Sequence, residues 1–232
     1  MAYSAVMLDG LGSLYASARA RITEMTAALS DDAANQTCPA TPEWTVHDVI
    51  AHLRGITEDV RTGNLDGVTT DPWTAAQVAR HQHTSLSDLL AGWTQDAPIL
   101  ESVLSSGEPD VPIRAVFDLY AHEADLRGAL GLEASLPENF GQWAIPIIAG
   151  GFVANVQAAG LPAVRVVATE GDEIGASDAP VTLRASRFEL FRSLLGRRSA
   201  AQVAACDWGN ADPAPYLKHF FTFGPRDTDL VE

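Results

Sequence analysis

The chain has 232 residues, of which 47% are hydrophobic and 19% are charged. This composition excludes a disordered chain and is enough for one large domain or two smaller ones. Aspartate and glutamate number 30 against 15 lysines and arginines, which gives a net charge of −15 at pH 7. Such an acidic surface repels phosphate backbones, and the basic cluster of Arg192, Arg197 and Arg198 is small, so we expect no nucleic-acid partner.

No apolar run approaches the roughly 20 residues that a membrane-spanning helix needs. The first residues lack a basic start followed by a purely apolar stretch, so no signal peptide is predicted, and we expect a cytoplasmic protein without a membrane partner. The two cysteines, Cys38 and Cys206, lie far apart and outside any C-x-x-C spacing. This pattern predicts ordinary buried or half-buried thiols and excludes a disulfide framework or a zinc ribbon.

Helical periodicity dominates the first part of the chain. A first helix is predicted from about Ser4 to Leu29, before a polar stretch that contains two prolines. Thr45 with Asp48 three residues on comes close to a capping box at the start of a second helix, VHDVIAHLRGITEDV. The apolar positions of this segment share one face, namely Val46, Val49, Ile50 and Leu53.

A third helix is predicted to begin after Asp71, with Asp71 as its cap and Pro72 in its first turn, and to run on towards SVLSSG. A fourth is predicted from about Ile113 to Leu130, closed by Gly131. Four long helices joined by loops indicate an antiparallel four-helix bundle.

The pattern changes after about residue 160. AVRVVATEG and APVTLRA are typical of strands, and SRFELFRSLLG is typical of a helix capped by Ser186, with Glu189 at the box position. SAAQVAAC predicts a further short helix, and a helix within residues 137–160 connects the two parts. We therefore predict an α+β chain with a helical bundle over residues 1–160 and a small α/β domain over residues 161–232.

Asp118 and His122 are four residues apart on the predicted fourth helix, so they project from the same face, which also carries Asp125. A carboxylate and an imidazole at this spacing can share a metal ion, and His52, flanked by apolar residues on the second helix, is the best third ligand. Two imidazoles and a carboxylate leave one position open, as in catalytic zinc sites.

The alternative is that these histidines are ordinary hydrogen-bonded residues and that the D-x-x-x-H spacing arises by chance. The remaining histidines are interpreted as surface or rim residues, namely His47, His81, His83 and His219. The tryptophans have core packing as their default role, namely Trp73, Trp93 and Trp143.

Two segments, TPEWTVHDVIAHLRG and DLYAHEADLRGALG, resemble the signature elements of the mycothiol-dependent maleylpyruvate isomerase family, within the DinB-like metalloenzymes. In this resemblance Trp44 and Thr45 open the ligand helix, and the metal ligands are His52, Asp118 and His122. The trailing positions of the second element are occupied by Glu123, Asp125 and Arg127. LFRSLLGRRSAAQV, DPAPYL and FFTFGP resemble the small α/β domain that follows the bundle in many actinobacterial members.

The sequence departs from the family pattern at Asp118, where the best-understood members carry glutamate. No catalytic arginine can be matched, so Arg187, Arg197 and Arg198 stay candidates, and the GRR segment is equally typical of a helix end, where cations complement exposed carbonyls.

The resemblance implies a zinc ion, or another divalent metal, with mycothiol as cosubstrate and an electrophilic small molecule as substrate. A metal-activated thiolate would then bring about cis–trans isomerisation or thiol S-transfer. Two alternatives stay open: a metal-dependent hydrolase, and a metal-binding regulatory module without turnover. The identity of the substrate does not follow from the sequence.

Overall fold

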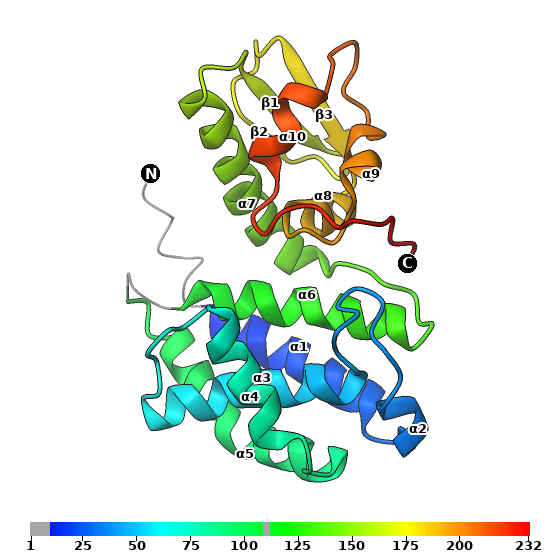
Figure 1. The fold of residues 1–232 in the computed structure, drawn as a ribbon. Helices are drawn as coiled ribbons and strands as arrows, with labels where there is room; N and C mark the ends of the chain where they lie inside the picture. The colour runs from blue at the N-terminus through cyan, green and yellow to red at the C-terminus, as the bar shows by residue number, and fades with distance from the viewer. Residues whose placement is uncertain (1–9, 109–111) are drawn as a thin grey trace. The chain divides into compact units, whose positions relative to one another are not determined.

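A computed structural model describes residues 10–108 and 112–232 of the chain (Figure 1). Its contacts divide the chain into two compact units, Met1–Ala134 and Ser135–Glu232. The first unit is helical, and the second combines helices with a small sheet. The predicted α+β class, with a helical N-terminal part and a C-terminal sheet, is therefore confirmed. None of the helices in the described ranges has the length and apolar character that crossing a membrane requires.

The first unit is built around a four-helix bundle. Helix α1 packs against α5 and α6, and α3 packs against the same two helices, while α4 lies along α3 (Figure 1). The helices of this unit are α1 (Leu11–Thr26), α2 (Asp31–Ala34), α3 (Val46–Thr62), α4 (Asp71–His81), α5 (Leu86–Leu104) and α6 (Ile113–Ala129). The predicted bundle is present, and the start of the expected first helix, residues 4–9, lies outside the described residues.

Helix α3 begins as the sequence predicts. The Thr45 hydroxyl accepts a hydrogen bond from the Asp48 amide, and the Asp48 carboxylate accepts one from the Thr45 amide, which completes a capping box. The helix ends at Gly63, whose φ of 74° is easily adopted only by a residue without a side chain. Its apolar face is fully buried in the bundle, including Val46, Val49, Ile50 and Leu53.

The single third helix predicted after Asp71 is wrong in two respects. The chain forms two helices, α4 and α5, because residues 82–85 leave the helix and the Ser85 hydroxyl caps α5 by accepting from the Asp88 amide. The first residue of α4 is Asp71 itself, and its N-cap is Thr70, which makes no side-chain capping bond. The break allows α4 to pack against α3 as a separate element.

Helix α4 approaches α3 closely at Gly55. A Cβ atom at Gly55 would lie 2.5 Å from the Cβ of Gln77, so any side chain there would push the helices apart. Gln77 is therefore held against α3 and is fully buried.

Helix α6 covers Ile113–Ala129, one residue short of the prediction, and Gly131 follows with a φ of 66°. One side of α6 faces the bundle, so that Val116, Leu119 and Leu126 are fully buried. Asp118 and His122 stand on this helix one turn apart.

The second unit carries a three-stranded sheet in the order β2–β1–β3. Strand β1 (Val164–Ala168) pairs parallel with β3 (Val181–Ala185) and antiparallel with β2 (Glu173–Ile174). The helices of this unit are α7 (Glu138–Ala158), α8 (Arg187–Leu194), α9 (Ala200–Ala204) and α10 (Ala214–Phe220). The strands and helices expected after residue 160 are present, and β2 and α10 were not expected.

The boundary between the units differs from the expected position at residue 160. Helix α7 packs against α8, α10, β1 and β2, so it belongs to the second unit, and the division falls after Ala134. Its aromatic side chains account for this packing: Phe140 contacts Phe191, and Phe152 contacts Trp208 and Phe220, with the rings edge to face in each pair.

Candidate metal centre

His52 lies on α3 and is buried, with 4% of the residue exposed. Its Nε2 atom is 3.0 Å from Oδ2 of Asp118 on α6, and its Nδ1 atom is 2.8 Å from Oε1 of Gln77 on α4. The imidazole is therefore fixed at both nitrogens, and one of them faces α6. The helix periodicity that buries Val49, Ile50 and Leu53 also turns His52 towards the interior.

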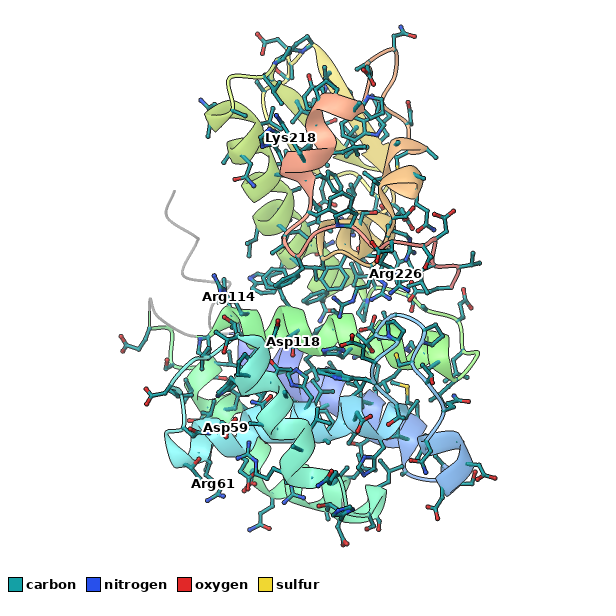
Figure 2. The ribbon with its side chains drawn as sticks, viewed as in Figure 1. Asp59, Arg61, Arg114, Asp118, Lys218 and Arg226 are labelled. Carbon is teal, nitrogen blue, oxygen red and sulfur yellow. The ribbon has the colours of Figure 1, made fainter. Side chains whose placement is uncertain are left out.

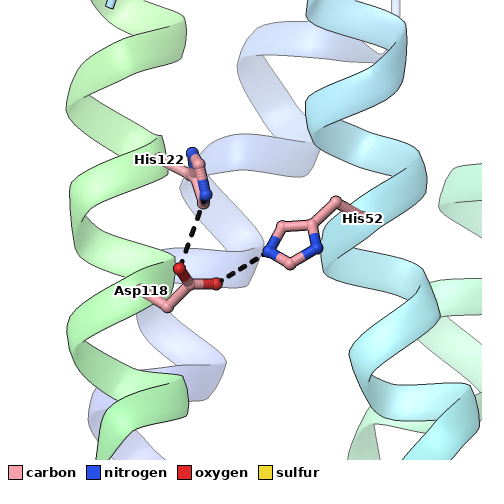
Figure 3. A group of neighbouring side chains, drawn as sticks. All are labelled: His52, Asp118 and His122. Atoms are coloured by element: carbon pink, nitrogen blue, oxygen red, sulfur yellow. Dashed lines mark hydrogen bonds and ion pairs between the residues drawn. The ribbon is translucent and has the colours of Figure 1, made fainter. Parts of the chain in front are cut away.

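Asp118 and His122 face each other along α6. Oδ1 of Asp118 is 3.5 Å from Nε2 of His122, one helical turn further on. His122 is buried, whereas the Asp118 side chain is 36% exposed, so the group is reached from solvent through the carboxylate. Figure 3 shows that His52 reaches this pair from the neighbouring helix.

Together, these three side chains can hold a metal ion. One ligand atom from each of His52, Asp118 and His122 lies within 4.8 Å of the others. Two imidazole nitrogens and a carboxylate oxygen form a common donor set for zinc and other divalent transition metals. The structure thus brings together the three residues that the sequence selected.

An outer ring of side chains orients the two imidazoles. Nδ1 of His122 is 3.0 Å from Oδ2 of Asp125, which is fully buried on the same helix. The Trp44 ring lies against both imidazoles, with centroids 5.1 Å from His52 and 5.8 Å from His122. Metal-binding histidines usually have such a partner on the second nitrogen, which fixes the orientation of the ring.

The electrostatics of this group suit a cation. Burial alone would raise the pKa of Asp118, but the adjacent His122 and His52 outweigh burial and hold that pKa well below its usual range. Burial alone would lower the pKa of His122, but Asp118 and Asp125 outweigh it and raise that pKa to about 9. Without a metal, His122 therefore carries a proton and a positive charge at neutral pH. A bound divalent ion would displace that proton.

Other residues of the second signature element have structural partners. The Glu123 carboxylate accepts two hydrogen bonds from the Arg21 guanidinium, at 2.7 and 2.6 Å, and lies 3.4 Å from Arg127. These contacts join α6 to α1 and do not involve the three donors. Of the trailing positions, Asp125 is therefore the one that contacts a predicted ligand.

The remaining histidines are mostly peripheral, as expected, with one correction. His83 is exposed, and His47 and His219 are half-buried. His81 was expected at the surface or rim and is instead buried, with Nε2 3.0 Å from the Glu58 carboxylate. Burial holds the pKa of His81 below its usual value.

The arginines considered for catalysis all lie in the second unit and have partners there. Arg187 pairs with Asp172, and Arg198 pairs with Glu189 and Glu232. Arg197 donates to the Leu195 carbonyl at the end of α8, which fits the helix-end interpretation of the GRR segment. Arg192 of the expected basic cluster is fully buried and pairs with Glu232.

The burial of the cysteines and tryptophans largely agrees with the prediction from the sequence. Cys38 is buried and Cys206 is half-buried, and neither forms a disulfide. Trp93 and Trp143 are core residues, whereas Trp73 is half-buried and donates to the Asn64 carbonyl.

Sequence reasoning missed two residues of the outer ring, Gln77 and Asp59. Gln77 contacts His52, and its amide nitrogen donates to Asp59, which is labelled with Asp118 in Figure 2. Asp59 lies seven residues after His52, and this spacing places the two on one face of α3. That spacing was the available signal, whereas Gln77 gave none, because it lies within a segment taken for one continuous helix.

Residues 15–127 match the family model described as the mycothiol maleylpyruvate isomerase N-terminal domain. In a comparison of structures, the chain is similar to a crystal structure of a histidine-to-alanine mutant of the mycothiol-dependent maleylpyruvate isomerase. The TM-score is 0.56 at 13% sequence identity, over 82% of this chain and 89% of that chain. This likeness concerns the fold. A comparison with curated protein sequences gives no match.

Proposed function

Because its N-terminal unit belongs to the mycothiol maleylpyruvate isomerase N-terminal domain family, we propose that this protein is a metal-dependent enzyme that uses mycothiol. The metal ligands in this proposal are His52, Asp118 and His122, with zinc as the preferred ion. The observation that carries it is the convergence of three donor atoms within 4.8 Å of one another, from two helices of the bundle.

The donor set fits a catalytic rather than a structural ion. Structural zinc sites take four protein ligands, whereas three ligands leave a position for a substrate or water. The partial exposure of Asp118 provides access to that position. A bound divalent ion would lower the pKa of a thiol placed there and so supply a thiolate at neutral pH.

Each residue of the site has a defined role in this proposal. His52 and His122 present ring nitrogens, and Asp118 supplies the negative charge. Asp125 holds the Nδ1 proton of His122, which leaves Nε2 free to coordinate. Trp44 packs against both imidazoles, so it restricts their rotation and keeps water from that side.

The reaction class that we propose is addition of the thiolate to an electrophilic small molecule, followed by cis–trans isomerisation or by S-transfer. A thiol cosubstrate is supported by the match of residues 15–127 to the family model and by the similarity in fold to the mycothiol-dependent maleylpyruvate isomerase. The half-exposed Asp118 would also admit water, so a hydrolase is the second candidate. A hydrolase would not bind mycothiol, which a calorimetric titration of the metal-loaded protein with mycothiol would reveal.

Metal analysis tests the ligand set directly. Protein purified without chelator should contain about one zinc per chain. His52→Ala should lose that metal, whereas His83→Ala, which removes an exposed histidine of the same unit, should keep it. Retention of metal by His52→Ala would overturn the ligand assignment. Metal binding without mycothiol binding or turnover would favour the regulatory module.

A further inference from the structure

A buried chain of hydrogen bonds runs from the proposed ligand His52 to a charged side chain outside the site. Oε1 of Gln77 lies 2.8 Å from Nδ1 of His52, and Nε2 of Gln77 lies 2.7 Å from Oδ2 of Asp59. We propose that Asp59 and Gln77 are positioning residues that determine which nitrogen of the His52 ring carries the proton. With the proton on Nδ1, Nε2 presents its lone pair to the metal. This inference rests on the proposed metal site.

The first step is the charge on Asp59. Its side chain is fully buried, and its carboxylate accepts from Gln77 and, on Oδ1, from Arg80 and Asn64, each at 2.9 Å. Burial raises the pKa of Asp59, but the hydrogen bonds from Arg80, Gln77 and Asn64 outweigh burial and leave that pKa below its usual value. Asp59 is therefore an anion that accepts hydrogen bonds and donates none.

The second step is the orientation of the Gln77 amide. An amide has a donating end and an accepting end, and coordinates alone do not distinguish them. Because Oδ2 of Asp59 only accepts, the amide nitrogen of Gln77 must face Asp59. Its oxygen must then face His52, and there is no second arrangement that satisfies both contacts.

The third step is the His52 ring. An amide oxygen at 2.8 Å requires a proton on Nδ1 of His52. In the neutral ring that proton leaves Nε2 as the atom with a free lone pair, and Nε2 is the atom that faces Asp118. The charge of Asp59 thus determines, through one neutral amide, which nitrogen of His52 can bind a metal.

The two proposed histidine ligands are therefore oriented by carboxylates in different ways, one directly and one through an amide. His122 reaches the carboxylate of Asp125 directly, whereas His52 reaches that of Asp59 through Gln77. The relay depends on the close contact of α4 with α3, where Gly55 leaves room for Gln77.

Two variants interrupt the relay. In Asp59→Asn, the new amide oxygen would accept hydrogen bonds from Arg80 and Asn64, so the new amide nitrogen would face Gln77. The Gln77 amide would then have to turn its oxygen towards residue 59. Its nitrogen would face His52 and donate to it. Gln77→Met is similar in length and removes both hydrogen bonds. The matched control is Asn64→Ala, which removes a hydrogen bond to the same carboxylate and leaves Gln77 in place.

The measurements are the zinc dissociation constant, by competition with a chromophoric chelator, and the ring protons of ¹⁵N-labelled zinc-loaded protein. We expect Asp59→Asn and Gln77→Met to weaken zinc binding about 10- to 100-fold, the usual effect of changing an outer partner of a ligand. The Nδ1 proton of His52 should exchange rapidly in both variants, while that of His122 stays protected. Asn64→Ala should match the unaltered protein in all three readings.

The inference is overturned if both variants bind zinc as tightly as the unaltered protein and keep a protected Nδ1 proton on His52. Should Asp59→Asn fail to fold, the same readings on Gln77→Met decide the matter, with the protected His122 proton as proof of a folded site. Failure of the unaltered protein to bind any divalent metal would overturn the proposed function itself, and the relay with it. Zinc binding by the unaltered protein, with both variants unchanged, would overturn the relay alone.

Discussion

Each unit of the chain contains a cluster of charged and ionisable side chains with buried members, and the two clusters are built differently. In the second unit, the guanidinium groups of Arg192 and Arg198 meet carboxylates of the same unit, those of Glu232 and Glu189. In the first unit, His52, Asp118 and His122 turn their ligand atoms towards one another. In an ion pair the two opposite charges compensate each other, whereas a cluster of metal-ligand atoms is compensated by a bound cation. The cluster of the second unit therefore has a structural role, whereas the arrangement of His52, Asp118 and His122 supports the proposed metal binding.

The largest effect, on the free energy of unfolding, is expected from removing the Glu232 carboxylate in the second unit. Glu232→Ala removes a carboxylate that accepts from Arg192, which is fully buried, and from Arg198. Loss of one partner of a buried ion pair costs about 3–5 kcal/mol, because the other charge stays buried. Urea unfolding should show this loss, and the zinc content should not change.

The control for that variant is Glu173→Ala, which breaks a pair with Arg165 in which the carboxylate is 56% exposed. Exposed pairs contribute about 0–1 kcal/mol, so this change should be small. Equal effects of the two substitutions would contradict the structural role assigned to the buried pair.

The next effect concerns Asp118, the proposed ligand at which the sequence departs from the pattern of the family that it resembles. Asp118→Ala removes a proposed ligand and should weaken zinc binding by more than about 100-fold, which is beyond the range for outer partners. Asp118→Glu should stay within about tenfold of the unaltered protein, because both carboxylates bind zinc. Isothermal titration measures both, with exposed Glu24→Ala as control. Unchanged affinity in the alanine variant would remove Asp118 from the ligand set.

The three donors could be found from the sequence because each leaves a local signal. Asp118 and His122 share a helix face through their spacing, and the capping box at Thr45 fixes the start of the helix that carries His52. Helix periodicity then gives the direction in which each side chain points. The family resemblance joined the two elements, which spacing within one helix cannot do.

The features that could not be predicted from the sequence depend on contacts between helices and strands. Gln77 is uncharged, and its role exists only because α4 separates from α5 and packs on α3. The Ser85 and Asp88 pair at the start of α5 was the signal for that break. Similarly, α7 looks like a bundle helix in sequence, and only its packing on the sheet assigns it to the second unit.

A smaller effect follows from the pH dependence of Asp59. A carboxylate whose pKa is lower in the folded state contributes stability above its unfolded pKa, about 3.9, and that stability is lost as the pH falls through the folded value. We therefore expect part of the acid destabilisation of the metal-free protein below about pH 4 to come from Asp59. Asp59→Asn should show a shallower decline in urea-unfolding free energy between about pH 5 and 2.5. A decline as steep as that of the unaltered protein would contradict the ionised state on which the relay depends.

The smallest effects separate the stability of the fold from metal binding. Thr45 and Ser199 each complete a capping box, one on α3 of the first unit and one on α9 of the second. Replacement of either by alanine should lower the free energy of unfolding by about 1 kcal/mol, the usual contribution of an N-cap. Neither should change zinc affinity by more than about twofold, because sites without shared partners act independently to within about 0.5 kcal/mol. Urea unfolding and zinc titration on the same samples test this. If Thr45→Ala weakened zinc binding as much as Gln77→Met, affinity would follow the general stability of α3, and the specific contacts of His52 would lose their assigned role.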